Sequence, residues 1–321
     1  MSQSPRIAVV GSANVDLTTT TDKFPRPGET IFGNQFHLGF GGKGANQALA
    51  ARLCGSDVSM IGRVGDDLFG PATIQNFDSR GIDTSHLLIT PGVSSGVAPI
   101  FVDSSGQNRI LVIKGANDSL SPADVEAASD VLLRADIIVL QLEVPLETVY
   151  FTLRFAGRHG IPAILNPAPA QELDRSEITR ADYFIPNETE AAAISAGMPV
   201  GNLDEAKACA QALVRGGMRR VIITLGANGA VLASADRVDH VPAFPVNAVD
   251  TTGAGDAFIG SLAFSLASGC DEFEAIRRAN LYASLSTLRT GAQSSFVTRE
   301  QFESEWARRT AQPTGPTRQT G

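Results

Sequence analysis

The sequence predicts an α/β fold: a mostly parallel, doubly wound sheet with helices on both faces and a small antiparallel β lid beside it. Short apolar, β-branched runs alternate with helical segments through most of the chain, as in sheets with crossover helices. Antiparallel-looking strands at about 14–38 and 94–113 interrupt this alternation, and we expect them to form the lid. No linker divides the chain, so we expect one domain over residues 1–309 and a flexible tail at 310–321.

The composition is that of an ordinary soluble globular protein, with 43% hydrophobic and 19% charged residues. The formal net charge is −8 and no basic run appears, which argues against nucleic acid and anionic membranes as partners. No apolar run reaches about 18 residues, and the polar start Met1–Arg6 is not a signal peptide. The scattered cysteines predict reduced thiols in the cytoplasm, and the histidines show no metal-binding spacing. These residues are Cys54, Cys209 and Cys270, and His37, His86, His159 and His240.

The first predicted strand, Arg6–Gly11, delivers two polar side chains. Asn14 and Asp16 are two residues apart, so an extended chain would point both to one face. At the carboxyl end of a strand this pair suits recognition of hydroxyl groups, and a simple Asx turn is the alternative. The turn at Gly11–Asn14 would be the first tight turn between a strand and a helix.

A glycine-rich segment, Gly39–Ala48, precedes a helix that we expect to end near Arg52. Its glycines match GxGxxG, but the dinucleotide fingerprint belongs in the first strand-to-helix turn, and the Walker spacing is missing. The segment could bring backbone N–H groups, Lys43 and Asn46 against a polyhydroxylated ligand. Tight helix packing is the alternative function of these glycines.

From Asp57 onward the pattern alternates strand and helix. The expected strands are 57–62, 136–140, 162–165, 181–185 and 220–224, and the expected helices include 68–80, one starting at Ser121, 145–159 and 203–215. Ligands collect beyond the carboxyl ends of strands in such sheets. The polar and glycine residues that fall there are Asn14, Asp16, Glu143, Asn166, Asn187, Glu190 and Gly226.

The stretch Asp250–Phe258 (DTTGAGDAF) follows an extended-looking segment at Val246–Val249 and leads into a buried helix. Gly253, Ala254 and Gly255 would lie at the helix N-terminus, where free N–H groups and the helix dipole attract an anion. Asp256 follows directly and could take a proton from a hydroxyl while those N–H groups hold a transferring phosphoryl group. A glycine-rich turn with Asp256 capping a helix is the alternative.

With GGKGANQA and DTTGAGDAF both present and in this order, the chain resembles the PfkB, or ribokinase-like, family of carbohydrate kinases. The resemblance runs from Ile7 to about Phe296, and NPAPA, PNETE, ITLGANGA and GAQSS resemble ribokinases and deoxyribokinases within that family. It implies transfer of the γ-phosphoryl group of ATP to a terminal sugar hydroxyl in sugar catabolism. It also implies Mg²⁺, K⁺ or a similar activating ion, and a homodimer formed through the lid.

The resemblance further implies roles for individual residues. Asp256 would be the base on the 5-hydroxyl, and Gly253, Ala254 and Gly255 would form the anion hole. The sugar would be held by Asn14, Asp16, Gly42, Lys43, Asn46 and Glu143. ATP would contact Asn187, Thr224, Gly226, Gly229, Gly255 and Asn280, and Glu190 would act near Mg²⁺-bound water. The monovalent cation would be bound by Asp250, Thr252, Ser286, Arg289, Gly291 and Ser295.

Two rival functions and one substrate question remain. A dinucleotide-dependent oxidoreductase would need glycines that the first turn lacks, and an inactive sugar-binding protein of the same fold would be expected to have lost Asp256. Several segments are more similar to deoxyribokinases, whereas the polar Asn14 favours a sugar with one more hydroxyl. We therefore predict D-ribose as the better substrate; the alternative is a kinase for the 5-hydroxyl of 2-deoxy-D-ribose or another sugar kinase of the PfkB family.

Overall fold

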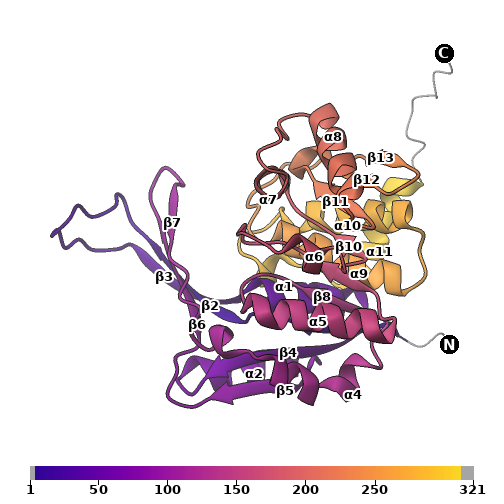
Figure 1. The fold of residues 1–321 in the computed structure, drawn as a ribbon. Coiled ribbons are helices and arrows are strands. Elements are labelled where there is room, and N and C mark those ends of the chain that lie inside the picture. Colours follow the sequence, from indigo (N-terminus) through magenta and orange to yellow (C-terminus); the bar gives the residue numbers. More distant parts are fainter. Residues whose placement is uncertain (1–3, 312–321) are drawn as a thin grey trace.

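The computed structural model describes residues 4–311 of the chain. A nine-stranded sheet in the order β13-β12-β11-β10-β9-β8-β1-β4-β5 forms the centre of the body, with helices on both sides (Figure 1). The strands are β1 (Arg6–Val10), β4 (Asp57–Gly65), β5 (Asp83–Thr90), β8 (Ile137–Leu140), β9 (Ala163–Leu165), β10 (Tyr183–Phe184), β11 (Val221–Thr224), β12 (Ala230–Ala233) and β13 (Val238–Val241). The neighbours from β11 to β5 pair in parallel, whereas β12 and β13 add an antiparallel edge. The predicted mostly parallel sheet is confirmed.

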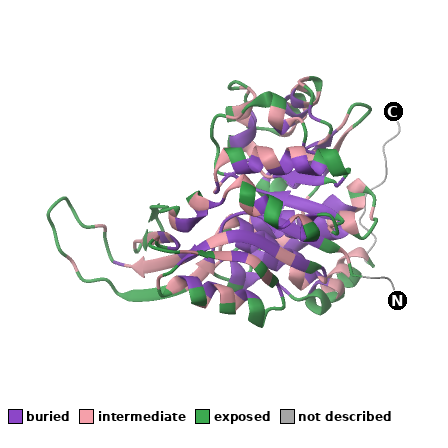
Figure 2. Cartoon of the chain, turned by 60° about the horizontal axis from the view of Figure 1, so that its bottom comes forward, coloured by how far each residue is buried: buried purple, intermediate pink, exposed green. Residues whose placement is uncertain are grey.

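The strands at the centre of the sheet bury both of their faces. In β1, Ile7 and Val9 belong to one buried apolar cluster, and Ala8 and Val10 belong to another, as the alternation of side chains along a strand requires. The first cluster includes side chains from the helices at 43–54, 69–79, 254–267, 272–286 and 299–310, and the second includes side chains from the helices between 122 and 215. The interior is continuously buried on both sides of the sheet (Figure 2).

The helices are α1 (Lys43–Cys54), α2 (Phe69–Ser79), α3 (Pro122–Ala127), α4 (Ser129–Leu132), α5 (Leu146–His159), α6 (Arg175–Ile178), α7 (Glu188–Ile194), α8 (Leu203–Arg215), α9 (Ala254–Ala267), α10 (Glu272–Ser286) and α11 (Arg299–Thr310). Most of these helices follow predicted segments, whereas α6, α10 and α11 were not predicted. Short 3₁₀ turns are η1 (Gly115–Ser119), η2 (Gly226–Asn228) and η3 (Gln293–Ser295). Ser121 caps α3 in a capping box with Asp124, as the sequence predicted for this helix start.

The lid is a second, four-stranded sheet that extends away from the body (Figure 1). Its strands are β2 (Asn14–Thr20), β3 (Gln35–Gly41), β6 (Gly96–Val102) and β7 (Asn108–Ile110). The pairs β2–β3 and β6–β7 are antiparallel, and β2 joins β6 in parallel. The lid therefore arises from the two predicted stretches, with β3 running to Gly41 rather than to residue 38.

The structure also differs from the sequence analysis in one turn, in several strands and in the end of the last helix. The turn at Gly11–Asn14 does not lead into a helix; β1 is followed by β2 of the lid. The strands β5, β12 and β13 were not predicted, and Val246–Val249 carries no strand. Helix α11 continues to Thr310, and residues 312–321 of the predicted tail lie outside the described residues. Among residues 4–311, none of the helices combines the length and apolar character needed to cross a membrane.

Candidate active site

A cavity of about 200 Å³ opens at the carboxyl ends of β9, β10 and β11, next to the first turns of α1 and α9. It is lined by Lys43, Asn166, Ala168, Ile185, Asn187, Glu190, Thr224, Gly253, Gly255, Asp256 and Ile259. From the sequence we expected polar side chains at successive strand ends to meet. The structure brings Asn166, Asn187 and Glu190 together with Asp256. This edge of the sheet is where doubly wound folds bind ligands.

Asp256 lies in the first turn of α9, and its side chain is almost completely buried at 8% exposure. The Nδ2 of Asn46 donates to its Oδ2 at 2.9 Å, and the Nε2 of Gln47 donates to its Oδ1 at 2.9 Å. Burial raises the pKa of Asp256 above its ordinary value, whereas Lys43 and the two amide donors lower it. A buried carboxylate that is accessible from a cavity and held by neutral donors is suited to accept a proton.

The N-terminus of α9 lies where the sequence analysis expects an anion cradle. Gly253 has φ 77°, a left-handed conformation that suits glycine, and it turns the chain into the helix. The N–H groups of Gly255 and Asp256 have no acceptor among the described residues, and the space beside Gly255 is open. Because α9 is 14 residues long, its dipole adds to the attraction of these N–H groups for an anion.

The glycines that precede α1 bring its first turn against the strand that enters the lid. A Cβ atom on Gly42, which has φ 91°, would lie 2.7 Å from the backbone nitrogen of Asn14. A Cβ atom on Gly44 would lie 2.6 Å from the backbone nitrogen of Ser12. These two glycines therefore serve close packing, which was the alternative in the sequence analysis, and they place Lys43 on the cavity wall.

Lys43 supplies the positive charge of the site. Burial lowers the pKa of its ammonium group, but Asp256, Glu143 and Glu190 outweigh burial and hold the pKa above its usual value. The ammonium group is therefore charged at neutral pH. A Lys at this place can balance anionic oxygens on a ligand in the cavity.

The predicted hydroxyl-binding residues meet where β2 leaves the body. Asn14 is buried, and its Oδ1 accepts a hydrogen bond of 2.7 Å from the Nδ2 of Asn117. The Oε2 of Glu143 accepts from the Oγ of Ser12 at 2.6 Å and from the backbone N–H of Lys43 at 3.0 Å. Burial, followed by the charges of Glu143 and Asp256, raises the pKa of Asp16 to about 6.

The predicted nucleotide residues are only partly brought together. Asn187 caps α7 in a capping box: its side chain accepts from the N–H of Glu190, and the Glu190 side chain accepts from the N–H of Asn187, both at 2.9 Å. Burial raises the pKa of Glu190. Thr224 lines the cavity, and Gly226 and Gly229 belong to the turn after β11.

Asn280, from α10, does not line the cavity. Its Nδ2 donates to the backbone oxygen atoms of Val241 at 2.9 Å and Pro242 at 3.3 Å. The NH₂ group of Asn280 therefore fixes the backbone at the end of β13. Because that group is already bonded, only the side-chain oxygen atom of Asn280 would be left to contact a nucleotide.

The predicted cation-binding residues come from two segments that touch. The carboxylate of Asp250 accepts from the N–H and Oγ1 of Thr252 at 2.9 and 2.7 Å, and from the N–H of Gly291 at 2.8 Å. Ser286, Ser295 and Arg289 flank this contact in sequence; the hydroxyl groups of Ser286 and Ser295 donate to backbone oxygen atoms three residues earlier. Among residues 4–311, no group of three His, Cys, Asp or Glu side chains could hold a metal ion.

The sequence analysis missed the amide side chains that surround the site. Four buried amides belong to this set: Gln47 bonds to Asp256, Gln141 to Gln47, Gln293 to Asn46, and Asn117 to Asn14. Two of them lie inside segments already singled out, since Gln47 follows Asn46 and Gln293 belongs to GAQSS. An amide side chain among small apolar residues, as at Gln47, could have indicated a buried polar group of the site.

The chain is similar to known carbohydrate kinases. The model of the pfkB family of carbohydrate kinases matches residues 4–299. A deoxyribokinase of Salmonella typhi is 50% identical over 297 residues, covering 92% of this chain and 97% of that protein. A ribokinase of Bacillus subtilis is 41% identical, covering 92% of this chain and 98% of that protein.

Solved structures show the same fold. Ribokinase from Thermotoga maritima superposes with a TM-score of 0.85 at 35% identity, covering 93% of this chain and 98% of that one. Arabidopsis thaliana ribokinase complexed with ribose and ATP superposes with a TM-score of 0.87 at 28% identity, covering 94% of this chain and 98% of that one. The likeness therefore includes the lid as well as the body.

Proposed function

This chain belongs to the pfkB family of carbohydrate kinases, and we propose that it transfers the γ-phosphoryl group of ATP to the 5-hydroxyl of D-ribose. The products are D-ribose 5-phosphate and ADP. The observation that carries the proposal is the position of Asp256, a buried carboxylate beside the unpartnered N–H groups of a helix that begins at a cavity. Relatives named as ribokinases, including one solved with ribose and ATP, support the substrate pair.

In the proposed reaction, each step is assigned to particular residues of this chain. Asp256 would accept the proton of the 5-hydroxyl while the sugar oxygen O5 attacks the γ-phosphorus. The bond between the γ-phosphorus and the leaving oxygen of ADP breaks in the same step. The N–H groups of Gly255 and Asp256 would hold the oxygen atoms of the transferring group, and Lys43 would balance their charge. Asn14, Asp16 and Glu143 would orient the sugar by its other hydroxyl groups.

Two ions are part of the proposal. The carboxylate of Glu190 on the cavity wall fits a Mg²⁺ ion held through water, and that ion would neutralise phosphate charge on bound ATP. The contact between Asp250 and Gly291 fits a monovalent cation site that also includes Thr252, Ser286, Arg289 and Ser295. We infer that such an ion would order the loop before α9.

A second candidate is preferential phosphorylation of 2-deoxy-D-ribose, since a deoxyribokinase of Salmonella typhi is 50% identical to this chain. Against it stands Asn14, whose buried amide would lose a partner when the sugar lacks a hydroxyl. We therefore place ribose first and expect 2-deoxyribose to be accepted.

A coupled ADP-release assay with a panel of pentoses and hexoses tests the proposal. We expect ribose to give the highest kcat/KM, followed by 2-deoxyribose. A higher value for 2-deoxyribose would establish the second candidate, and no sugar-dependent ADP release would refute both.

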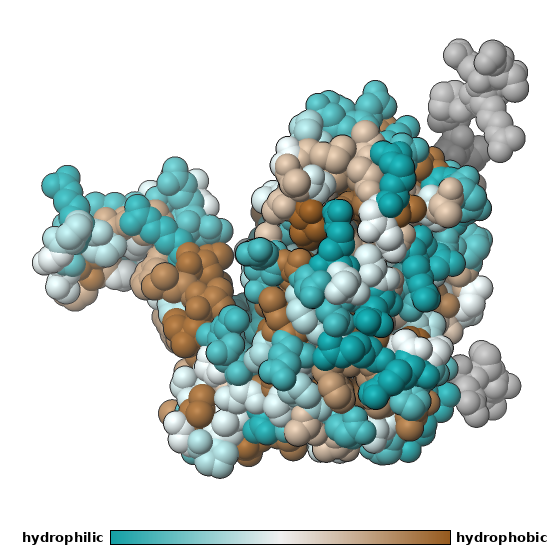
Figure 3. All heavy atoms as spheres, viewed as in Figure 1, coloured by the Kyte–Doolittle hydropathy of each residue, from teal (hydrophilic) through white to brown (hydrophobic). Residues whose placement is uncertain are grey.

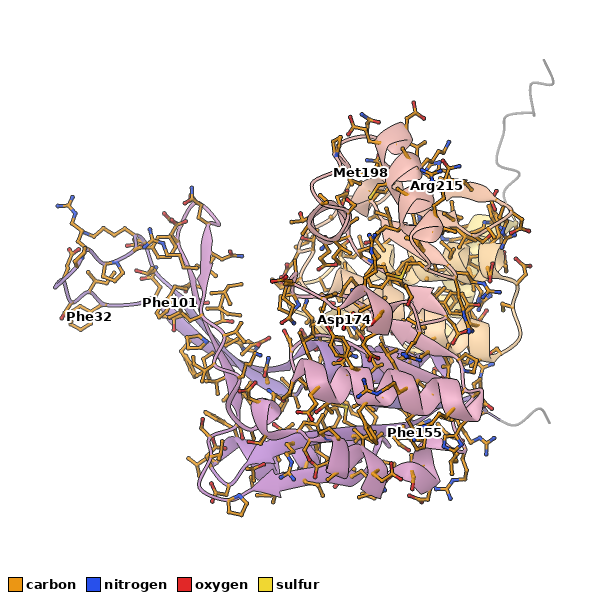
Figure 4. All side chains as sticks on the ribbon, in the orientation of Figure 1. Phe32, Phe101, Phe155, Asp174, Met198 and Arg215 are labelled. Atoms are coloured by element: carbon orange, nitrogen blue, oxygen red, sulfur yellow. The ribbon has the colours of Figure 1, made fainter. Side chains whose placement is uncertain are left out.

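We also propose a homodimer formed through the lid. Apolar side chains gather where the lid leaves the body (Figure 3), and Phe32 and Phe101 lie on the lid away from the body (Figure 4). Phe36 and Leu111 are each 65% exposed, which is an unusual use of apolar side chains on a free sheet. The three free cysteines fit a reducing compartment, so we propose a cytoplasmic location.

A further inference from the structure

Two chains of side-chain amides converge on Asp256. The first begins at Gln141, which follows β8: its Nε2 donates to the Oε1 of Gln47 at 2.7 Å. The Nε2 of Gln47 then donates to the Oδ1 of Asp256 at 2.9 Å and to the Oδ1 of Asn166 at 3.2 Å. Gln47 and Gln141 are fully buried, so water does not compete for these bonds.

The direction of this chain follows from the charge of its end. A carboxylate only accepts hydrogen bonds, so Gln47 must turn its NH₂ group toward Asp256 and its oxygen away. Gln141 must then offer its own NH₂ group to that oxygen. The Oε1 of Gln141 is left buried, with no hydrogen-bond partner among the described residues.

This unpartnered oxygen atom needs an explanation, because a buried acceptor without a donor destabilises a fold. Gly11 leaves the space in which it lies: a Cβ atom there would be 2.0 Å from the Oε1 of Gln141. Turning the Gln141 amide over would face two oxygen atoms toward each other at Gln47. The Gln141 amide therefore keeps the orientation in which its NH₂ group bonds to Gln47, although its own Oε1 then has no hydrogen-bond donor.

The second chain reaches the other carboxylate oxygen. The Nδ2 of Asn46 donates to the Oδ2 of Asp256 at 2.9 Å, and the Nε2 of Gln293 donates to the Oδ1 of Asn46 at 3.2 Å. The Nδ2 of Asn76 in turn donates to the Oε1 of Gln293 at 3.3 Å. Its outer end is a cation, because the Nε of Arg80 donates to the Oδ1 of Asn76 at 3.3 Å.

We propose that Gln141 and Gln293 are positioning residues that act through Gln47 and Asn46 to hold Asp256 as an oriented proton acceptor. The inference rests on the proposed kinase function. Apart from the bond from Gln47 to Asn166, the bonds in both chains donate toward Asp256, so each chain stabilises the charged form of Asp256 and fixes the plane of its carboxylate. The charged groups that act on Asp256 from neighbouring elements are Lys43 of α1, Glu143 after β8, Glu190 of α7 and Asp16 of β2.

The test replaces Gln141, which does not touch Asp256, with an apolar side chain of similar size. In Gln141→Leu the Gln47 amide loses its orienting donor, so kcat for ribose should fall about 2- to 12-fold, the range for one hydrogen bond. The acidic limb of the kcat profile should move to higher pH, while the KM for ATP stays unchanged. The melting temperature should stay close to that of the wild type, because the variant removes the unpartnered Oε1 of Gln141 but leaves the buried Oε1 of Gln47 without a donor in its place.

Ser56→Ala is the matched control. The Oγ of Ser56 is the other buried side-chain atom without a hydrogen-bond partner among residues 4–311, and it belongs to neither chain. This variant should keep the wild-type kcat and pH profile. Gln293→Met tests the second chain and should also shift the acidic limb; it decides the matter if Gln141→Leu does not fold.

The possible outcomes separate the two proposals. Absence of sugar-dependent turnover in the wild-type protein would refute the kinase function itself. Wild-type turnover with an unchanged kcat and an unchanged pH profile in the folded variants would overturn the positioning role alone. A lower kcat with a shifted acidic limb supports it.

Discussion

Asn117 donates a hydrogen bond of 2.7 Å from its Nδ2 to the Oδ1 of Asn14, and both side chains are buried. The Oδ1 of Asn117 accepts from the N–H of Ala13 at 2.9 Å, so the amide of Asn117 cannot turn over without losing this bond. The oxygen of Asn14 is therefore committed, and its NH₂ group is left as the donor. Gly96 keeps this contact possible, because a Cβ atom there would lie 2.2 Å from both atoms that form the bond.

Asn14→Met should shift substrate preference toward 2-deoxyribose. The variant removes the donor that a ribose hydroxyl would use and fills its space with an apolar side chain. An unpaired polar group costs about 1–3 kcal/mol, so the ratio of kcat/KM for the two sugars should change by roughly 5- to 150-fold. The measurement is that ratio in both proteins. If the ratio stays the same, Asn14 is not the cause of the preference.

Sugar affinity should depend on the protonation of Asp16, whose pKa burial and neighbouring carboxylates raise to about 6. Below this pH the side chain is protonated and loses acceptor capacity for sugar hydroxyl groups, so ribose should bind more weakly as the pH falls through about 6. Calorimetric titration with ribose between about pH 5 and pH 8 would show it. Under the same conditions Asp16→Asn should bind ribose weakly at every pH, and a wild-type affinity that does not change with pH would contradict the assignment.

The raised pKa of Asp16 should also make the free energy of unfolding decrease as the pH rises. The pKa of Asp16 is 3.8 without the influence of the fold and about 6 within it, so the folded protein binds this proton more tightly. The stability that Asp16 contributes is fully present below about 3.8 and is lost as the pH rises through about 6. Asp16→Asn should therefore flatten the decline of unfolding free energy over this window. A decline of the same size in the variant would assign it to other groups.

Turnover should require K⁺ or an ion of similar size. Asp250 joins the loop before α9 to the segment at Gly291, so an ion bound there would order the anion cradle without touching the sugar. The comparison is kcat in potassium against kcat in a bulky organic cation at equal ionic strength. Equal rates in the two salts would remove the ion from the account.

The dimer proposal predicts that charge on the lid separates the subunits. Leu111 is 65% exposed on the lid, whereas Leu68, at 90%, is an exposed leucine that precedes α2 on the body. Leu111→Glu should give a monomer in light scattering after size exclusion, because a charge would be buried at the interface. Leu68→Glu, the control, should remain a dimer. A wild-type monomer, or a dimer that persists in Leu111→Glu, would refute the lid as the interface.

The sequence predicted the body of the fold well because its strands and helices have strong local signals. The apolar runs at Arg6–Val10 and Ile137–Leu140 are buried on both faces, and Ser121 and Pro122 mark a helix start. The strand β5 was missed because only one of its eight residues, Leu87, is buried. Strands at the edge of a sheet lack the apolar pattern that identifies central ones.

The sequence analysis named the charged residues near the cavity and several of its asparagines, but it missed the amides Gln47, Gln141, Gln293 and Asn117. Asp256, Lys43 and Glu190 lie in glycine-rich or capping segments with recognisable spacing. The partners of Gln47 and Asn14 come from distant parts of the chain: Gln141 is 94 residues from Gln47, and Asn117 is 103 residues from Asn14. No local pattern encodes such pairs, because only the folded chain brings them together.

The most direct test of the account is the turnover of Asp256→Asn with ribose and ATP, measured as ADP release beside the wild-type protein. The amide keeps the size of the side chain but cannot take the proton, so kcat should fall by about 10²- to 10⁴-fold. Ribose and ATP should bind nearly as well as before. Near-normal turnover in the variant would contradict Asp256 as the base and, with it, the mechanism proposed for this site.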